Sequence, residues 1–299
     1  MAGNTFLTPT VISKVAIGAL VQDLVLPRLV NRDVEADFQG GTGTVVNVRI
    51  PPTVTGGGAR TYTQTLRDAA TPIVLDRITE TTIPVTIGPM LYKGVPVTDE
   101  EFTFTLTDFT RQVIEPIVQP VGIGAEALLA AEINSFPAST TIVPAADGSD
   151  LHDAILEARM TLDKRYVPKQ GRMLIVSPEI EMSLLSDPIN RLVRYQDSGS
   201  TEVLREANIG RLYGMPVIGS TELTAKSFVI MTRDAFTFVM RAPAVPAGCT
   251  FGQSVSYQGM AMRFIRDYDS AFMQDRAICS VFAGAETLDA QRAIRVVAA

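Results

Sequence analysis

The chain has 299 residues, of which 46% are hydrophobic and 19% charged, and its formal net charge is −6. The length suits about two compact domains, and the low charged fraction leaves apolar surface that self-association would bury. Proteins that bind nucleic acid tightly do so through clustered Lys and Arg residues on one face. The acidic net charge of this chain argues against that class of protein.

Residue types that carry catalysis or bind metals are sparse. Cys249 and Cys279 lie far apart without a C-x-x-C motif, which indicates neither a zinc site nor a disulfide framework and fits a reducing, intracellular origin. His152 is the single histidine, and its place in the first turn of an expected helix favours a solvated side chain over a Ser-His-Asp triad. The first ten residues lack the pattern of a signal peptide. No P-loop, G-x-S-x-G or H-E-x-x-H motif occurs, so no catalytic, cofactor-binding or metal-binding residues are expected.

An amphipathic arm is expected from Thr8 to Val30, where apolar residues recur in helical spacing until Pro27. Such an arm packs on its own domain or on a neighbouring chain, and the sequence leaves both open. From Phe38 to Val97 the pattern changes to alternating apolar and polar residues. This alternation predicts two half-buried strands, around residues 46–50 and 82–87.

The connection between these strands, Pro51 to Pro72, is long and polar, with little apolar material to anchor it. A segment of this kind is a disordered loop or a hairpin that reaches out to a partner. In the second case Arg60 and Arg67 would pair with acidic residues of a neighbouring chain, each exposed pair contributing under about 1 kcal/mol. The residues expected in this contact are Arg49, Arg60, Tyr62, Arg67 and Arg77. Pro84, which has no amide donor, suits an edge strand.

The longest apolar run with helix signals is Thr105 to Phe136, and it opens with Thr105 and Asp108 in capping-box spacing. As one helix it would be about 45 Å long, at about 1.5 Å per residue. A break in helix hydrogen bonding is expected between Glu115 and Gly124. The residues that predict this bend are Pro116, Pro120, Gly122 and Gly124. Ionisable side chains within the run argue against a membrane span, and no membrane partner is expected.

The same run permits an alternative of another class, a dinucleotide-binding enzyme. Gly122, Gly124 and Ala127 spell G-x-G-x-x-A, and Asp147 follows at roughly the spacing of about 20 residues that this motif requires. The residues before Gly122 would then have to form a central parallel strand. Pro116 and other prolines there cannot donate to such a ladder, so the alternative is disfavoured and no cofactor is expected.

A Pro/Ser/Thr-rich connector, Pro137 to Ser149, is the expected domain boundary. After it come an amphipathic helix from Leu151 to Leu162 and a strand, Arg172 to Val176, which leads directly into a second helix and so predicts a sheet flanked by helices. Further strands are expected at 228–231, 236–240, 255–266, 277–282 and 292–297, the first two joined as a hairpin. Asp267 and Asp269 lack the glycine and distal Glu of a calcium loop, which favours a salt-bridged turn.

The order of these parts resembles the major capsid proteins of tailed bacteriophages. The resemblance is carried by the N-terminal segment from Leu7 to Arg32, by I-G-R-L-Y-G-M-P-V at 209–217 and by R-D-Y-D at 266–269, and it extends over nearly the whole chain. It implies the α+β fold shared by tailed phages, herpesviruses and encapsulins. The implied parts are an N-terminal arm (1–37), an extended loop with flanking strands (38–97), a peripheral domain with a spine helix (98–148), an axial domain (149–258) and C-terminal strands of the peripheral domain (259–299).

The resemblance also implies a function without catalysis. Copies of the chain would assemble, as hexamers and pentamers, into an icosahedral shell around a double-stranded DNA genome, with assembly in the host cytoplasm and the virion as the final location. Scaffolding, portal and decoration proteins are implied partners, and packaged DNA would be contacted only through non-specific proximity. An encapsulin-like protein nanocompartment is the alternative with the same fold. Some relatives cross-link their shells through a Lys of the extended loop; no Lys lies between Asp37 and Tyr92, so no such cross-link is expected.

Overall fold

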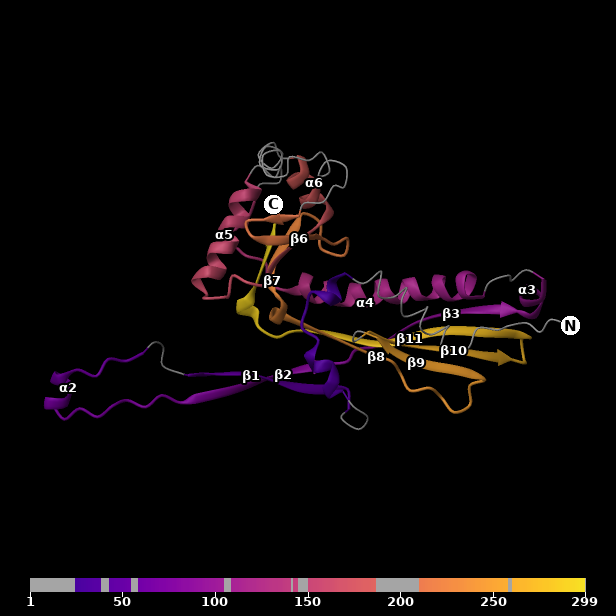
Figure 1. Ribbon diagram of the computed structural model, residues 1–299, viewed down its shortest axis with the longest axis horizontal. Helices are drawn as coiled ribbons and strands as arrows, with labels where there is room; N and C mark the ends of the chain where they lie inside the picture. The colour runs from indigo at the N-terminus through magenta and orange to yellow at the C-terminus, as the bar shows by residue number, and fades with distance from the viewer. Residues whose placement is uncertain are drawn as a thin grey trace.

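The computed structural model describes residues 25–38, 43–54, 59–104, 109–140, 142–144, 150–186, 210–257 and 260–298. Within these ranges the chain forms two packed units and a long arm that extends away from both (Figure 1). The proposed capping residues Thr105 and Asp108, the acidic residue Asp147 and most of the amphipathic arm lie outside the described residues.

The first unit is built on helix α4, Glu115–Ser135, which lies along a five-stranded antiparallel sheet (Figure 1). We call this helix and sheet the spine unit. The strand order is β3-β11-β10-β9, and β8 pairs with the far part of β11. The strands are β3 Met90–Thr98, β8 Phe236–Arg241, β9 Phe251–Tyr257, β10 Met260–Asp269 and β11 Gln274–Thr287. The short helix α3, Asp99–Phe104, follows β3, and the π-helical turn η3, Thr110–Ile114, leads into α4.

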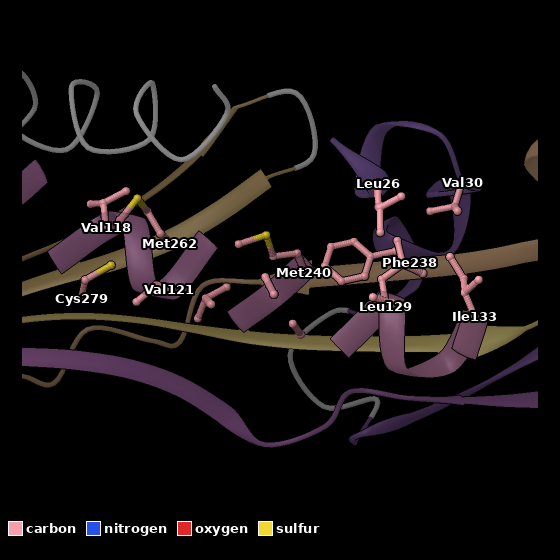
Figure 2. Packing of buried hydrophobic residues seen from close by; sticks show 14 of the residues in the cluster. Leu26, Val30, Val118, Val121, Leu129, Ile133, Phe238, Met240, Met262 and Cys279 are labelled. Atoms are coloured by element: carbon pink, nitrogen blue, oxygen red, sulfur yellow. The ribbon is translucent and has the colours of Figure 1, made fainter. Parts of the chain in front are cut away.

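One face of α4 is apolar along its whole length, because buried residues recur every fourth position from Ile117 to Ile133. At one end of this face Val118 and Val121 lie with Met262 of β10 and Cys279 of β11 (Figure 2). Each such side chain contributes about 1.5–3 kcal/mol when fully buried. Burial against the sheet therefore holds α4 in place.

The other end of α4 is covered by the segment Val25–Phe38, which we call the strap. Its two short 3-10 helices are η1, Leu26–Arg28, and η2, Asp33–Asp37. Leu26 lies beside Leu129 and Phe238 in the core (Figure 2). The amide of Leu26 donates to Oε1 of Glu126 at 3.2 Å, so a side chain of α4 anchors the start of the described chain.

The expected interruption of the helix between Glu115 and Gly124 is wrong, because α4 is helical across these residues. The bend assigned to the prolines and glycines of this segment stays a prediction. Pro116 lies in the first turn, where a missing amide costs no internal hydrogen bond. Pro120 lies inside the helix on its exposed face, where burial of neighbouring residues compensates for the lost bond. The irregular turn is instead η3, which directly precedes Glu115.

Helix α4 and the end of η3 also have the length and composition of a membrane span. Among the described residues, Gln112–Ser135 is the helical segment that passes this test, and half of its apolar window is buried inside the protein. A core helix of a folded domain satisfies the same test, and the packing of α4 on the sheet accounts for its apolar residues.

The second unit, which we call the α/β unit, is a five-stranded sheet in the order β12-β7-β4-β6-β5 with helices α5 and α6. β4 and β6 are parallel, whereas the other pairs are antiparallel. β7 is buried along its whole length, as a central strand should be. The elements are α5 Leu151–Lys164, β4 Arg172–Val176, α6 Pro178–Ser186, β5 Arg211–Leu212, β6 Met215–Gly219, β7 Ser227–Thr232 and β12 Ala293–Val297.

The predicted hairpin of residues 228–231 and 236–240 is wrong. β7 pairs with β4 and β12, whereas β8 pairs with β11 in the other sheet. The 3-10 turn η4, Arg233–Ala235, redirects the chain from one unit to the other. Both strands are buried almost throughout, so each needs a sheet and a covering layer that a two-stranded hairpin does not provide.

Sheet membership also crosses the predicted domain limits. β8 and β9 lie within 149–258 but belong to the sheet of the spine unit, and β12 lies within 259–299 but belongs to the α/β unit. Short-range pattern cannot reveal this exchange, because each strand pairs with a segment far away in the sequence. The domain ranges themselves stay a prediction.

The arm is a two-stranded ribbon of β1, Val45–Val54, and β2, Ile78–Thr86, which extends to the left in Figure 1 and carries the short helix α2, Gln64–Asp68, near its end. The pairing confirms the alternation seen in the sequence and places Pro84 opposite Asn47 in a ribbon whose strands both have a free edge. The root of the arm has its own small core, in which Val85 packs with residues of the strap and of β8.

Candidate assembly surface

Two chemical alternatives, a metal site and the dinucleotide motif, can be compared with the described residues. No cluster of three or more His, Cys, Asp and Glu that could hold a metal occurs among them. Gly122, Gly124 and Ala127 lie inside α4 and not at a turn between a strand and a helix. A dinucleotide motif needs its glycines at that turn, so the structure contradicts the enzyme alternative.

The arm is the part of the molecule most exposed to a partner. From Arg60 to Arg77 no residue is buried, and α2 covers nothing in its own subunit. Such a ribbon is unstable alone in water, because two strands cannot bury both of their faces. Contact with another molecule would bury the exposed face of the ribbon and so stabilise it.

The two sides of the loop beyond the ribbon are joined by an ion pair. The guanidinium of Arg60 donates from Nη2 to Oδ1 of Asp76 at 2.7 Å and from Nε to Oδ2 at 3.3 Å. A bidentate pair of this type fixes direction as well as distance. The structure therefore pairs Arg60 within its own loop, where an acidic residue of a neighbour had been expected.

Tyr62 and Arg67 meet at the base of α2. The hydroxyl of Tyr62 donates to the carbonyl of Thr71 at 2.9 Å, and the guanidinium of Arg67 lies 6.0 Å from the Tyr62 ring centre. These two contacts order the end of the loop, although no buried hydrophobic residues lie there. Arg49 in β1 and Arg77 before β2 are exposed. Of the five residues predicted for this contact, the structure shows Tyr62 and Arg67 in contact with each other.

Sequence reasoning missed the most apolar feature of the arm. The side chains of Ile73, Val74, Leu75 and Ile78 are between 61% and 81% exposed. We call these four residues the apolar strip. Exposed aliphatic residues that follow one another along a projecting segment indicate an interaction site. The signal was present as the run I-V-L between Pro72 and Asp76, but the polar composition of the longer segment obscured it.

At its root the arm crosses β11 at unusually short range. The amide of Gly88 donates to the carbonyl of Ala283 at 2.9 Å. A Cβ at the neighbouring Gly284 would lie 2.2 Å from the carbonyl oxygen of Thr86, which is closer than any real contact of this kind. A glycine is therefore required where the arm leaves the spine unit.

The far end of the spine unit carries a network of ion pairs. Asp267 and Asp269 at the end of β10 pair with Arg276 of β11 at 3.2 and 3.4 Å, and Arg266 pairs with Asp275. This confirms the salt-bridged interpretation, although the residues lie on paired strands and not in the turn itself. The guanidinium of Arg266 also lies against two aromatic rings, those of Phe102 and Phe109.

The strap holds a carboxyl group whose pKa is raised by burial. Glu35 pairs with Arg32 at 2.9 Å, and Arg32 in turn lies over the ring of Phe238. Burial raises the pKa of the Glu35 carboxyl to about 7, while the nearby Arg32 charge opposes the shift.

His152 is not the solvated side chain that its position suggested. It is half-buried, and its Nδ1 lies 3.0 Å from the hydroxyl oxygen of Tyr213, which comes from the β5–β6 turn. The environment of His152 thus depends on its packing against a distant part of the α/β unit, which the local sequence does not show. The contact supplies no nucleophile or carboxylate of a catalytic triad.

Comparison with known structures shows which architecture combines these features. A solved structure from Mycobacterium phage Che8 matches with a TM-score of 0.68 at 20% identity, over 91% of this chain and 90% of that chain. The capsid of cyanophage P-SCSP1u matches with a TM-score of 0.59 at 14% identity, over 86% and 84%. The fold is that of tailed-phage capsid proteins. The α+β capsid fold implied by the sequence is thereby confirmed.

The capsid fold is not restricted to phages. A virus-like particle from Pyrococcus furiosus matches with a TM-score of 0.52 at 14% identity, over 96% of this chain and 98% of that chain. No protein-family model matches the sequence, and neither does any curated protein. The likeness to the capsid fold is thus visible in three dimensions where the sequences have diverged.

Proposed function

We propose that the chain is the major capsid protein of a tailed bacteriophage and assembles into a closed icosahedral shell of hexamers and pentamers. The observation that carries this proposal is a capsid fold that covers nine-tenths of this chain and of its Che8 neighbour, together with an arm whose outer part, from Arg60 to Arg77, has no buried residue. The function is structural and needs no catalytic residue or cofactor.

The arm supplies the assembly contact in this proposal. The apolar strip is covered by an adjacent copy, and burial contributes roughly 25 cal/mol for each Å² of apolar surface removed from water. The loop arginines lie at the rim of that contact. There each exposed ion pair contributes under about 1 kcal/mol, so many weak contacts repeated over the shell produce its stability.

The same proposal assigns the partners. Scaffolding, portal and decoration proteins act on the shell during assembly in the host cytoplasm, and the finished virion encloses double-stranded DNA. The net charge of −6 favours a wall that packaged DNA touches through proximity and does not bind tightly. A shell without an isopeptide cross-link from the loop follows from the absence of Lys between Asp37 and Tyr92.

A protein nanocompartment is the second candidate, because the Pyrococcus furiosus virus-like particle has the same fold over almost the whole of both chains. The two candidates differ in the contents of the particle. A phage shell protects nucleic acid, whereas a nanocompartment encloses protein.

The test is to produce the full chain, examine the product by negative-stain microscopy and assay purified particles from its native source for nuclease-protected DNA. We expect closed shells of uniform diameter, with double-stranded DNA in the native particles. Shells that contain protein cargo and no DNA would favour the nanocompartment. A chain that stays monomeric, alone and with the other proteins of its native particle, would contradict both candidates.

A further inference from the structure

The turn that ends α5 holds an aromatic side chain in solvent. Tyr166 has a φ of 57°, and its side chain is 94% exposed. The left-handed conformation at a helix end favours glycine, because a Cβ crowds the following carbonyl. In the described part of the chain the Tyr166 side chain makes no hydrogen bond or ring contact. Within the described residues, no contact of the Tyr166 side chain offsets the cost of this conformation.

The backbone of the turn is well defined. The amide of Tyr166 donates to the carbonyl of Asp163 at 3.0 Å, and the amide of Val167 donates to the carbonyl of Leu162 at 3.1 Å. These two bonds form the Schellman pattern that closes a helix. Tyr166 occupies the position that glycine normally takes in this pattern, so its side chain points outward from a fixed backbone.

A buried arginine holds the turn from beneath. Arg172 is 3% exposed, pairs with Asp163 at 2.7 Å and donates to the carbonyls of Val167 and Pro168 at 2.5 and 2.9 Å. The bond from Arg172 lowers the pKa of the Asp163 carboxyl. The turn thus remains rigid while the ring of Tyr166 stays uncovered.

The surroundings of the ring indicate what covers it. Lys164, Arg165 and Lys169 are exposed around it on a chain whose net charge is −6, so another copy of the chain presents a surface of opposite charge on average. Arg165 donates to the carbonyl of Ala293 at 3.2 Å, and Lys169 lies 3.7 Å from Asp163. These cations are already partly engaged, which favours a protein partner over the phosphates of a nucleic acid.

The position of the turn agrees with that partner. Figure 1 shows α5 on the side of the α/β unit toward which the arm extends. A neighbouring copy that covers the arm would therefore lie on the same side of the molecule as α5. A tyrosine held rigidly at an interface loses little side-chain entropy on binding and is a frequent hot spot.

We propose that Tyr166 is an anchor residue that inserts into a second copy of this chain in the assembled shell. The inference rests on the proposed shell function and names a contact outside the arm. A preformed turn presents the ring in the subunit before assembly, and contact with the neighbour compensates for its unfavourable backbone conformation.

Replacing the tyrosine tests whether the ring serves assembly or the fold. For Tyr166→Gly we expect the concentration of free subunit in equilibrium with shells to rise about 10-fold or more, the loss typical of a hot spot. The thermal midpoint of the dissociated subunit should stay constant or rise, because glycine suits this φ. Tyr166→Phe keeps the ring and should assemble nearly as the parent chain does.

A matched control separates the ring from the backbone. Lys226 is also exposed with a positive φ, 54°, so Lys226→Gly makes the same backbone change elsewhere. We expect this variant to assemble like the parent chain. Unchanged assembly of Tyr166→Gly would overturn the inference and leave the shell function intact, whereas absence of shells from the parent chain would overturn the shell function itself.

A photo-crosslink identifies the partner directly. With p-benzoylphenylalanine in place of Tyr166, irradiation of assembled shells should give a band at twice the subunit mass, and peptide mapping should place the acceptor on another copy of the chain. Crosslinking to nucleic acid, or no crosslink in well-formed shells, would contradict the proposed anchor.

Discussion

At the scale of single residues, burial of the Glu35 carboxyl is expected to make the stability of the strap depend on pH. The main chain on both sides of Asn31 is bonded to β8, since Asn31 donates to the carbonyl of Phe236 and accepts from the amide of Phe238, each at 3.0 Å. The carboxyl of Glu35 is therefore held beside Arg32 and partly away from solvent. Arg233 lies close enough for its charge to act on Arg32 as well.

The direction of the pH dependence follows from the pKa of Glu35, about 7 in the folded chain against an ordinary value of 4.5. The folded state holds the proton more tightly, so this contribution to stability is complete below about pH 4.5 and is lost as the pH rises through 7. We expect the parent subunit to lose about 1 to 2 kcal/mol between about pH 5 and pH 8, allowing for the solvent that reaches the pair. Urea unfolding of Glu35→Gln should show most of this slope removed.

The control for Glu35→Gln is Glu80→Gln, which removes an exposed carboxylate of the arm. Its stability should keep the pH dependence of the parent chain. Equal slopes for the parent chain and Glu35→Gln would show that the proton on Glu35 does not contribute to folding.

At the scale of elements, the arm combines a regular ribbon with a loop that is ordered by few contacts. The pair of Arg60 and Asp76 joins the two sides of that loop, and a single exposed pair contributes under about 1 kcal/mol to a subunit. We expect a larger effect on assembly, because every copy in the proposed shell would have to present the apolar strip in the same geometry.

We therefore expect Arg60→Asp to leave the thermal midpoint of the subunit nearly unchanged but to lower the yield of closed shells several-fold, because two carboxylates then repel across the loop. The double variant Arg60→Asp with Asp76→Arg should restore most of the yield. Sedimentation of assembly mixtures measures both. Asp234→Arg, which breaks an exposed pair with Arg292 on the body, is the matched control and should not reduce the yield. If Arg60→Asp assembled as well as the parent chain, the pair of Arg60 and Asp76 would not be needed for assembly.

Local pattern predicted some elements well and others badly, for physical reasons. The alternation around Val48 and Val85 identified the ribbon, because each strand needs only its neighbour along the chain. The interruption expected between Glu115 and Gly124 was wrong because the buried face of α4 outweighs the one hydrogen bond that is missing at Pro120. The apolar strip was missed because short-range composition does not show whether an aliphatic residue finds a partner inside its own subunit.

At the scale of the whole molecule, the chain passes between the two units at three points, and the last two of these crossings lie close together. The chain passes from β7 to β8 through η4, and from β11 to β12 through the 3-10 turn η5, Ala290–Arg292. The crossings lie side by side, since the carbonyl of Ala235 accepts from the amides of Leu288 and Asp289 at 2.9 and 3.1 Å. The sheet of the spine unit thus includes β8 and β11, and the sheet of the α/β unit includes β7 and β12, so each crossing joins a strand of one sheet to a strand of the other.

The direction of the arm depends on the close approach at Gly284. In Gly284→Ala the new Cβ would meet the carbonyl oxygen of Thr86 at 2.2 Å and Cα of Ile87 at 3.1 Å, so the backbone at the root of the arm must shift. We expect the unfolding free energy of the subunit to fall by about 1–3 kcal/mol, as for other overpacked sites. We also expect few closed shells, because a displaced arm misses the surface of its neighbour.

Urea unfolding and negative-stain microscopy measure these two effects separately. Gly248→Ala is the matched control, because a Cβ at Gly248 meets no atom within 4 Å, and it should leave both the midpoint and the shells unchanged. Second-site variants that restore the stability of Gly284→Ala without moving the arm back should still fail to assemble, since the geometry of the root and not the stability of the body is what the shell requires. Normal shells from such a stabilised variant would show that the arm adapts its direction on binding.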